Sequence, residues 1–124
     1  MTMFRTATVA LGFAVAASNA FAAGDAARGK TTFQRCAICH RVDKDGGNGL
    51  GPNLFGVVGR KAGTVANFPY SVAMKNSGIT WSTDKLDAYI EHPSAVVPGN
   101  RMAFAGIGDA GQRADVVAYL ATLK

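Results

Sequence analysis

Cys36-Ala37-Ile38-Cys39-His40 is the stretch that decides how the rest of this sequence is interpreted. It contains both cysteines of the 124-residue chain, followed at once by a histidine. A disulfide or a thioredoxin-type redox pair would need only the two cysteines, but such a pair usually belongs to a βαβ unit, which this sequence does not predict. A zinc site would need four ligands, so His92 would have to join the two cysteines and His40.

A third interpretation of the motif is a covalently attached haem c, one per chain. In this arrangement Cys36 and Cys39 form thioether bonds with the haem, and His40 ligates the iron from one face. We favour this interpretation because the motif lies at the end of a predicted helix, early in a small chain with an export signal. A histidine directly after a cysteine also strains the tetrahedral closure of a zinc site.

The other face of a haem iron takes a second ligand or stays open, and Met102 is the candidate for that ligand. It lies in a predicted loop after Pro98, and a loop can present a thioether to the far face of a haem. The alternative is that Met102 fills a gap in the core. Met74 is predicted to pack in a short helix, and His92 to be a polar helix end before a proline.

Residues 1–22 have the pattern of a secretory signal peptide. A positive charge precedes an apolar stretch at residues 7–17, which is shorter than the roughly 20 residues that span a bilayer. Ala20-Phe21-Ala22 fits the small-x-small pattern of a cleavage site. We therefore expect cleavage after Ala22, export to the periplasm and one domain at residues 23–124. The alternative is an uncleaved membrane anchor.

The composition is that of a small folded domain. Hydrophobic residues make up 48% of the chain and charged residues 17%, which excludes a disordered polymer. A net charge of +5 is too small to argue for a nucleic-acid partner, and none is expected. No apolar run of membrane length follows the signal peptide, so we expect a soluble domain that does not span a membrane.

No segment alternates in the manner of a β-strand, so the expected fold class is all-α with long loops. Helices are predicted at residues 25–35, 71–77, 84–91 and 110–123, with loops at residues 45–67 and 96–104. Ser71 and Asp109 are the expected N-caps of the second and the last of these helices. Pro93 is expected to stop the third helix.

Five stretches of the sequence resemble the class I c-type cytochromes, the group of bacterial cytochrome c2 and mitochondrial cytochrome c. They are GDAARGKTTFQRCAICH (24–40), GPNLFGVVGRKAGT (51–64), YSVAMKNSGITW (70–81), YIEHPSAVVPGNRMAFAGI (89–107) and DVVAYLATLK (115–124). The resemblance implies a small haem-wrapping fold of three main helices, short helices and long Gly-rich loops. It also implies that His40 and Met102 are the two axial ligands of the iron.

The resemblance further implies roles for residues around the haem. The carbonyl of Pro52 would accept the second ring N–H of His40 and fix the orientation of the ring. Arg60, Tyr70 and Trp81 match residues near the haem propionates, where each can donate a hydrogen bond to a carboxylate. These residues are therefore expected to bind the cofactor, in addition to packing in the core.

Other matched positions concern the methionine and the crossing of two helices. Tyr89 matches a tyrosine whose hydroxyl lies near the methionine sulfur, and Asn100 stands where relatives carry threonine. Gly29 and Phe33 are expected to meet Tyr119 where the first and last helices cross. A glycine at such a crossing permits close approach of the two backbones.

With both axial positions filled by protein, the expected function is one-electron transfer by a monomeric carrier that is not an enzyme. The resemblance implies transient docking to membrane redox complexes. A quinol-oxidising bc1-type complex would be the donor, and a terminal oxidase, a photosynthetic reaction centre or a peroxidase the acceptor. Lys30, Arg35 and Arg101 would form a small basic rim for such docking. The alternative is a haem enzyme or a gas-binding cytochrome with an open sixth position.

Overall fold

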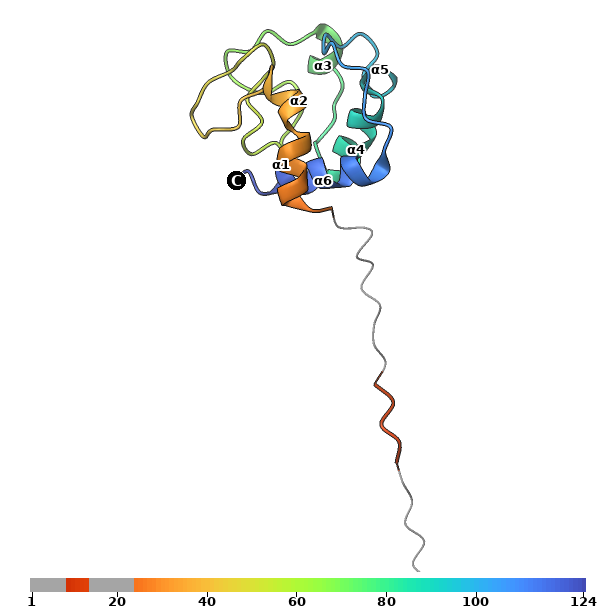
Figure 1. Ribbon diagram of the computed structural model, residues 1–124. Coiled ribbons are helices and arrows are strands. Elements are labelled where there is room, and N and C mark those ends of the chain that lie inside the picture. Colours follow the sequence, from red (N-terminus) through yellow and green to blue (C-terminus); the bar gives the residue numbers. More distant parts are fainter. Residues whose placement is uncertain (1–8, 14–23) are drawn as a thin grey trace, which may run out of the picture.

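The regular structure of the chain is helical in the computed structural model, which describes residues 9–13 and 24–124 (Figure 1). The helices are α1 (Ala26–Thr32), α2 (Gln34–Ala37), α3 (Val72–Lys75), α4 (Thr83–Glu91), α5 (Pro93–Val96) and α6 (Ala110–Ala121). Within the described ranges there is no strand, and Lys61 and Thr80 form one isolated antiparallel bridge. The predicted all-α fold class is confirmed.

The predicted signal peptide lies outside the described residues, apart from positions 9–13, which are exposed. The cleavage site after Ala22 is likewise outside them, so both stay predictions. None of the helices in the described part of the chain is long and apolar enough to cross a membrane.

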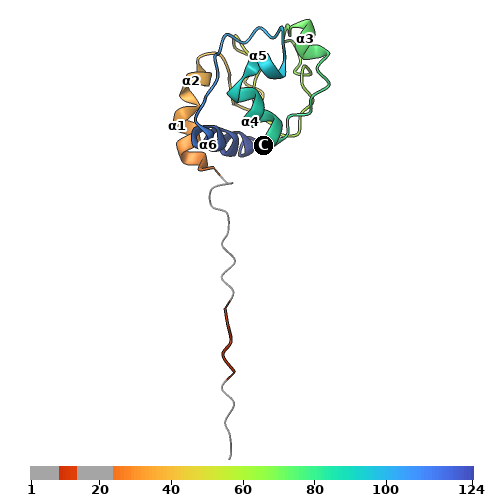
Figure 2. The same ribbon diagram turned by 90° about the vertical axis from the view of Figure 1, so that its right-hand side faces the viewer.

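Helices α1 and α6 cross at one end of the domain, with α3 and α5 at the opposite end (Figures 1 and 2). Gly29 of α1 is buried, and a side chain there would overlap with the backbone carbonyl of Asp115 in α6. The rings of Phe33 and Tyr119 pack beside this contact, with centroids 5.3 Å apart. The predicted meeting of Gly29, Phe33 and Tyr119 is therefore confirmed.

Four helices begin after a side chain that accepts a backbone N–H three residues later. Asp25, Ser71, Ser82 and Asp109 do so for α1, α3, α4 and α6. Each bond satisfies one of the N–H groups that have no partner inside the helix. The predicted N-caps Ser71 and Asp109 are confirmed, and Ser82 is a further one.

The prediction of one continuous helix at residues 25–35 is wrong. The helix is divided at Phe33 into α1 and α2, although the Phe33 N–H still bonds to the carbonyl of Gly29 at 2.8 Å. Helix α2 then continues past the predicted end to Ala37.

The proline that is predicted to stop α4 also starts a helix. Pro93 is the first residue of α5, a position that favours proline because an N–H there would have no partner in the helix. The helices predicted at residues 71–77 and 110–123 are shorter in the structure. Asn76 caps α3 and Thr122 caps α6, where their N–H groups turn back to carbonyls of the last turn.

The core joins α4 and α6 to the loops on either side of them. Its buried apolar residues are Phe33, Val57, Ala62, Trp81, Leu86, Tyr89, Ile90, Val97, Ile107, Val116, Val117 and Leu120. Many of these residues lie in loops rather than helices. The long loops are therefore packed parts of the domain, as their many glycines and few regular elements predict.

Arg113 is a buried charged residue that ties α6 to α4 and to the loop between α5 and α6. It pairs with Asp87 at 3.0 Å and with Glu91 at 3.6 Å, both in α4. Its Nη1 also donates to the carbonyls of Ile107 and Gly108, each at 2.9 Å. These bonds compensate for the burial of the guanidinium and fix the end of that loop.

The Asp115 carboxylate ties the start of α1 to α6. It accepts the backbone N–H of Asp25 at 2.7 Å and the Nε–H of Arg28 at 3.2 Å. The bond from Asp25, followed by the bond from Arg28, holds the pKa of Asp115 below its ordinary value. Such a carboxylate stabilises the fold above its ordinary pKa, and this contribution is lost as the pH falls through the lowered pKa.

We expect Asp115→Asn to lower the free energy of unfolding at pH 7, and the gap to wild type to narrow at about pH 3. Asparagine keeps an oxygen for the Asp25 N–H but removes the charge that pairs with Arg28. Urea unfolding of both proteins at the two pH values measures the gap. Asp43→Asn, which changes an exposed carboxylate, is the control. An equal gap at both pH values would contradict this role of Asp115.

Candidate functional site

A cavity of about 420 Å³ lies among α2, α4, α6 and the loops, and its wall is mostly apolar. This volume is in the range of roughly 300–1,000 Å³ that is common for small-molecule and cofactor sites. All the predicted site residues line this cavity: Cys36, Cys39, His40, Pro52, Arg60, Tyr70, Trp81, Tyr89 and Met102. Residues that are far apart in the sequence therefore meet in one place.

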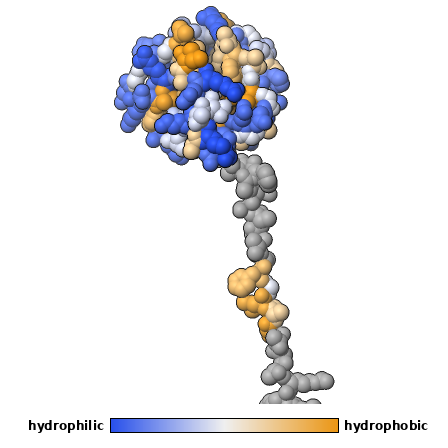
Figure 3. Space-filling view, in the orientation of Figure 1, coloured by the Kyte–Doolittle hydropathy of each residue, from blue (hydrophilic) through white to orange (hydrophobic). Residues whose placement is uncertain are grey.

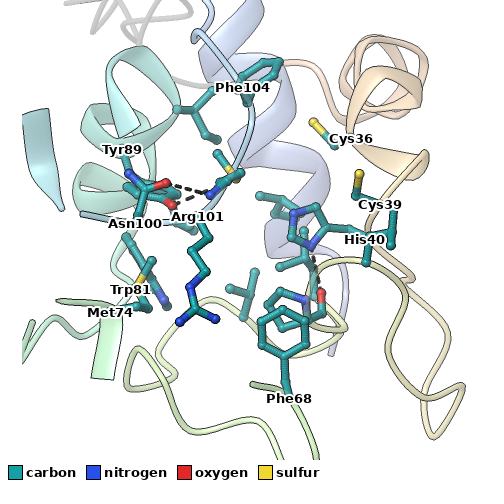
Figure 4. Close-up of a pocket in the computed structure, with 18 of the residues that line it drawn as sticks. Cys36, Cys39, His40, Phe68, Met74, Trp81, Tyr89, Asn100, Arg101 and Phe104 are labelled. Atoms are coloured by element: carbon teal, nitrogen blue, oxygen red, sulfur yellow. Dashed lines mark hydrogen bonds between the residues drawn. The ribbon is translucent and has the colours of Figure 1, made fainter. Parts of the chain in front are cut away.

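The CxxCH motif forms the turn at the end of α2, on one wall of the cavity. The N–H groups of Cys39 and His40 both bond to the carbonyl of Cys36, at 3.1 and 2.9 Å. This turn brings the two thiols and the imidazole to the same side of the cavity (Figure 4). The cysteines are not joined by a disulfide, and burial raises the pKa of the Cys36 thiol.

The ring of His40 is held in one orientation by the loop that follows it. Its Nδ1 lies 2.8 Å from the carbonyl oxygen of Pro52. Because a carbonyl can only accept, Nδ1 carries the proton, and Nε2 keeps its lone pair. A side chain at Gly51 would collide with the ring, so the glycine makes room for it. Burial lowers the pKa of His40, which favours the neutral imidazole that binds metals.

Tyr89 of α4 lies across the cavity from the cysteines (Figure 4). Its hydroxyl donates a hydrogen bond to the Sδ of Met102, at 3.9 Å. Its ring packs against Trp81, with centroids 4.9 Å apart. Burial raises the pKa of Tyr89 to about 12, so the hydroxyl keeps its proton at neutral pH. The thioether of Met102 is thus presented beside a hydrogen-bond donor.

Arg60 brings a partly buried positive charge to the apolar cavity. Its Nη1 donates to the carbonyl of Phe55 at 3.2 Å, and burial lowers the pKa of the guanidinium. The backbone N–H of Trp81 bonds to the backbone carbonyl of Arg60 at 2.9 Å. The segment that carries Trp81 therefore lies beside the segment that carries Arg60. The hydroxyl of Tyr70 accepts the N–H of Val65 at 3.1 Å. A partly buried guanidinium favours an anionic group on a bound ligand.

Several residues of the wall were not found by sequence reasoning. The further lining residues include Leu54, Phe68 and Phe104, while Arg101, predicted only as part of a basic rim, also lines the cavity. Phe104 had a detectable signal, because it follows Met102 in the same predicted loop. Phe68 had none, because it lies just after the predicted loop at residues 45–67 and before the helix predicted at residues 71–77. Met74, predicted to pack in a short helix, also lines the cavity (Figure 4).

The structure does not support the zinc alternative. His92 caps the end of α4 and does not line the cavity. Across residues 9–13 and 24–124, no group of three or more His, Cys, Asp or Glu side chains is arranged to hold a metal ion. The side chains that would have to form the zinc site are therefore not gathered around one point in the described part of the chain.

The sequence pattern of the family described as cytochrome c matches residues 26–124. The chain belongs to the cytochrome c family. Cytochrome c2 of Rhodomicrobium vannielii is 50% identical to it over 105 residues, which are 85% of this chain and 84% of the relative. Cytochrome c of Gibberella zeae is 48% identical over 100 residues, covering 80% of this chain and 94% of the relative.

A solved structure supports the same fold. This cytochrome matches cytochrome cH from Methylobacterium extorquens with a TM-score of 0.76 and 43% identity, over 80% of this chain and 99% of the other. Together with the resemblance to cytochromes c2, this assigns the helices and packed loops to the small all-α cytochrome c fold. The prediction of a class I c-type cytochrome is confirmed.

This cytochrome c carries covalently bound haem c and is an electron carrier, not an enzyme. The cavity fits that group. Two thiols stand on one wall for the thioether bonds, and the neutral imidazole of His40 is beside them. Apolar side chains suit the porphyrin, and Arg60 brings a positive charge suited to its carboxylates.

Proposed function

We propose that the chain is a periplasmic one-electron carrier in which His40 and Met102 are the axial ligands of haem c and Cys36 and Cys39 attach it. The observation that carries this proposal is that an imidazole and a thioether from distant segments line one cavity, each with a hydrogen-bond partner. When bound, haem would supply a one-electron Fe(II)/Fe(III) couple, and the thioether of Met102 would favour its reduced form.

The protein prepares both ligands in advance. The carbonyl of Pro52 fixes the His40 ring, so that Nε2 could bind the haem iron without a change of the His40 rotamer. The hydroxyl of Tyr89 donates to the sulfur of Met102. A site that is already in its final arrangement needs little rearrangement when an electron arrives, which keeps the barrier to electron transfer low.

The residues around the proposed propionate position are suited to carboxylates. Arg60 supplies charge, and Trp81 and Tyr70 line the same cavity. Burial lowers the pKa of Arg60, and an anionic partner would offset that burial. The proposal therefore assigns these residues to holding the haem carboxylates away from bulk water.

We also propose that residues 1–22 direct export and are removed after Ala22. Partners would be a bc1-type donor and an oxidase, reaction centre or peroxidase as acceptor.

Polar and apolar groups alternate over the face in Figure 3, without one dominant apolar patch. Near the motif, Ile38 and Leu50 are 80% and 81% exposed. Together with Arg35 they suit small, transient contacts with acidic partner surfaces.

The experiment starts with the protein from the periplasm of a strain that assembles haem c. Its mass should equal residues 23–124 plus one haem. The oxidised protein is then mixed with quinol and a purified bc1-type complex, and its reduction is followed by absorption. We expect rapid reduction that slows with ionic strength, because opposite charges steer the encounter.

Arg35→Gln should slow this reduction several-fold at low salt, since charge at the rim of an interface acts mainly on the association rate. Lys85→Gln, at an exposed position of α4 that does not line the cavity, is the matched control. A colourless periplasmic product would refute the proposal. So would a reduced protein that binds carbon monoxide readily at neutral pH, because that result requires an open sixth position.

A further inference from the structure

The loop between α5 and α6 carries Met102 and begins with a tight turn. The N–H of Asn100 bonds to the carbonyl of Val97 at 3.1 Å, and Gly99 has a φ of +88°. Proline at the second position and a glycine with positive φ at the third are typical of a type II turn, and Pro98 and Gly99 stand at these positions. The turn fixes the backbone just before Met102.

The amide side chain of Asn100 connects this turn to Met102. Its Nδ2 donates to the carbonyl of Val97 at 2.9 Å. Its Oδ1 accepts the backbone N–H of Met102 at 2.8 Å. Both ends of one partly buried amide are therefore used, and the side chain itself lines the cavity on the side away from His40 (Figure 4).

The far end of the loop is anchored independently. The N–H of Ile107 bonds to the carbonyl of Ile90 in α4 at 2.9 Å, and Arg113 holds the carbonyls of Ile107 and Gly108. Gly106, with a φ of +112°, lies so close to the Glu91 carbonyl that a side chain would overlap with it. From Ile107 onward the backbone is thus fixed to the helices.

Between these anchors the backbone has few ties. Within the described ranges, the carbonyl of Met102 accepts only the nearby N–H of Phe104, at 2.9 Å. Arg101, Ala103 and Ala105 are exposed. Among the described residues, Asn100 is the side chain that holds the backbone of Met102 in place. An outward movement of this segment, which would carry the thioether out of the cavity, would break the hydrogen bond between the Met102 N–H and Asn100 Oδ1.

We propose that Asn100 is a positioning residue that holds the thioether of Met102 in the cavity and slows its replacement by external ligands. The inference rests on the proposed function, in which Met102 ligates the iron. The amide acts through the backbone of Met102, because it bonds to the N–H of that residue and not to its sulfur. If the Asn100 amide were removed, the weak hydrogen bond from the Tyr89 hydroxyl would be the remaining side-chain bond that holds the Met102 sulfur in place.

The test measures how fast imidazole binds to the oxidised haem protein, in a stopped-flow experiment that follows loss of the sulfur-to-iron absorption band. Asn100→Ala should increase the rate by about tenfold, since two hydrogen bonds are lost. Asn100→Ser, whose hydroxyl can still accept the Met102 N–H, should give an intermediate rate. Asn76→Ala, at an exposed asparagine that caps α3 through its backbone, is the control and should bind imidazole at the wild-type rate.

A second measurement does not depend on the iron. Hydrogen exchange of the Met102 amide should be faster in Asn100→Ala, while amides of α6 exchange as in wild type. Wild-type rates of both imidazole binding and amide exchange in Asn100→Ala would overturn the positioning role, as would equal acceleration in Asn76→Ala. If Met102→Ala keeps the sulfur-to-iron band, the ligand assignment itself fails. If only the Asn100 variants behave as wild type, that assignment stands and the positioning role fails.

Discussion

In Met102→Ala, the oxidised protein loses its long-wavelength sulfur-to-iron absorption band, and its reduction potential falls by on the order of 100 mV. The physical reason is that a thioether stabilises Fe(II) relative to Fe(III). For a one-electron couple, about 59 mV corresponds to a tenfold change in the equilibrium constant. The reduced variant should also bind carbon monoxide, because the sixth position is open. Absorption spectroscopy and a redox titration measure these changes.

The matched control for this prediction is Met74→Ala. Both methionines line the cavity and both are partly buried, so the loss of a cavity side chain is common to the two variants. Only Met102 has a tyrosine hydroxyl beside its sulfur. We expect Met74→Ala to keep the absorption band and to lose some stability, by about 2 kcal/mol. A band that survives in Met102→Ala and disappears in Met74→Ala would reverse the assignment of the ligand.

The sequence was informative about this site because its chemistry depends on short motifs. Cys36, Cys39 and His40 lie within five residues, and the turn that presents them is local. The glycines of the following loops excluded long regular elements, so the class of the fold was predictable too. For Met102, the residue type and its position in a loop were compatible both with an iron ligand and with a residue that fills a gap in the core. The resemblance to cytochromes c then supplied the pairing of Met102 with His40.

The parts that were not predictable depend on contacts between distant segments. The division of the first helix at Phe33 into α1 and α2 is not marked by any change of periodicity. Arg113 was not recognised because its partners, Asp87 and the carbonyl of Ile107, come from α4 and a loop. Asp115 likewise bonds to Asp25, which is 90 positions away. A sequence pattern reports periods of a few residues and carries little information on such pairs.

Gly29→Ala tests the helix crossing on which the site depends, and the sign of its effect is the informative quantity. In the middle of a helix, alanine is favoured over glycine by about 0.8–1 kcal/mol, so propensity alone predicts a more stable protein. At Gly29 the new methyl group would overlap with the carbonyl of Asp115 and force α1 away from α6. We expect a net destabilisation of about 2–3 kcal/mol, measured by urea unfolding of the haem protein.

The control, Gly111→Ala, makes the same exchange in α6, where the residue is exposed and a methyl group meets only the Asp109 side chain, at 3.2 Å. The Asp109 oxygen that the methyl group meets belongs to the N-cap of α6 and would shift slightly, so the gain in helix propensity should be offset and stability should stay close to that of the wild type. Equal stabilisation by both substitutions would show that the backbones of α1 and α6 are not in close contact. Because α1 is joined through the short helix α2 to the turn with Cys36 and His40, loosening the crossing should also loosen the cavity wall that would hold the haem. The loss of the helix crossing and the loss of the haem site should therefore appear in the same unfolding transition.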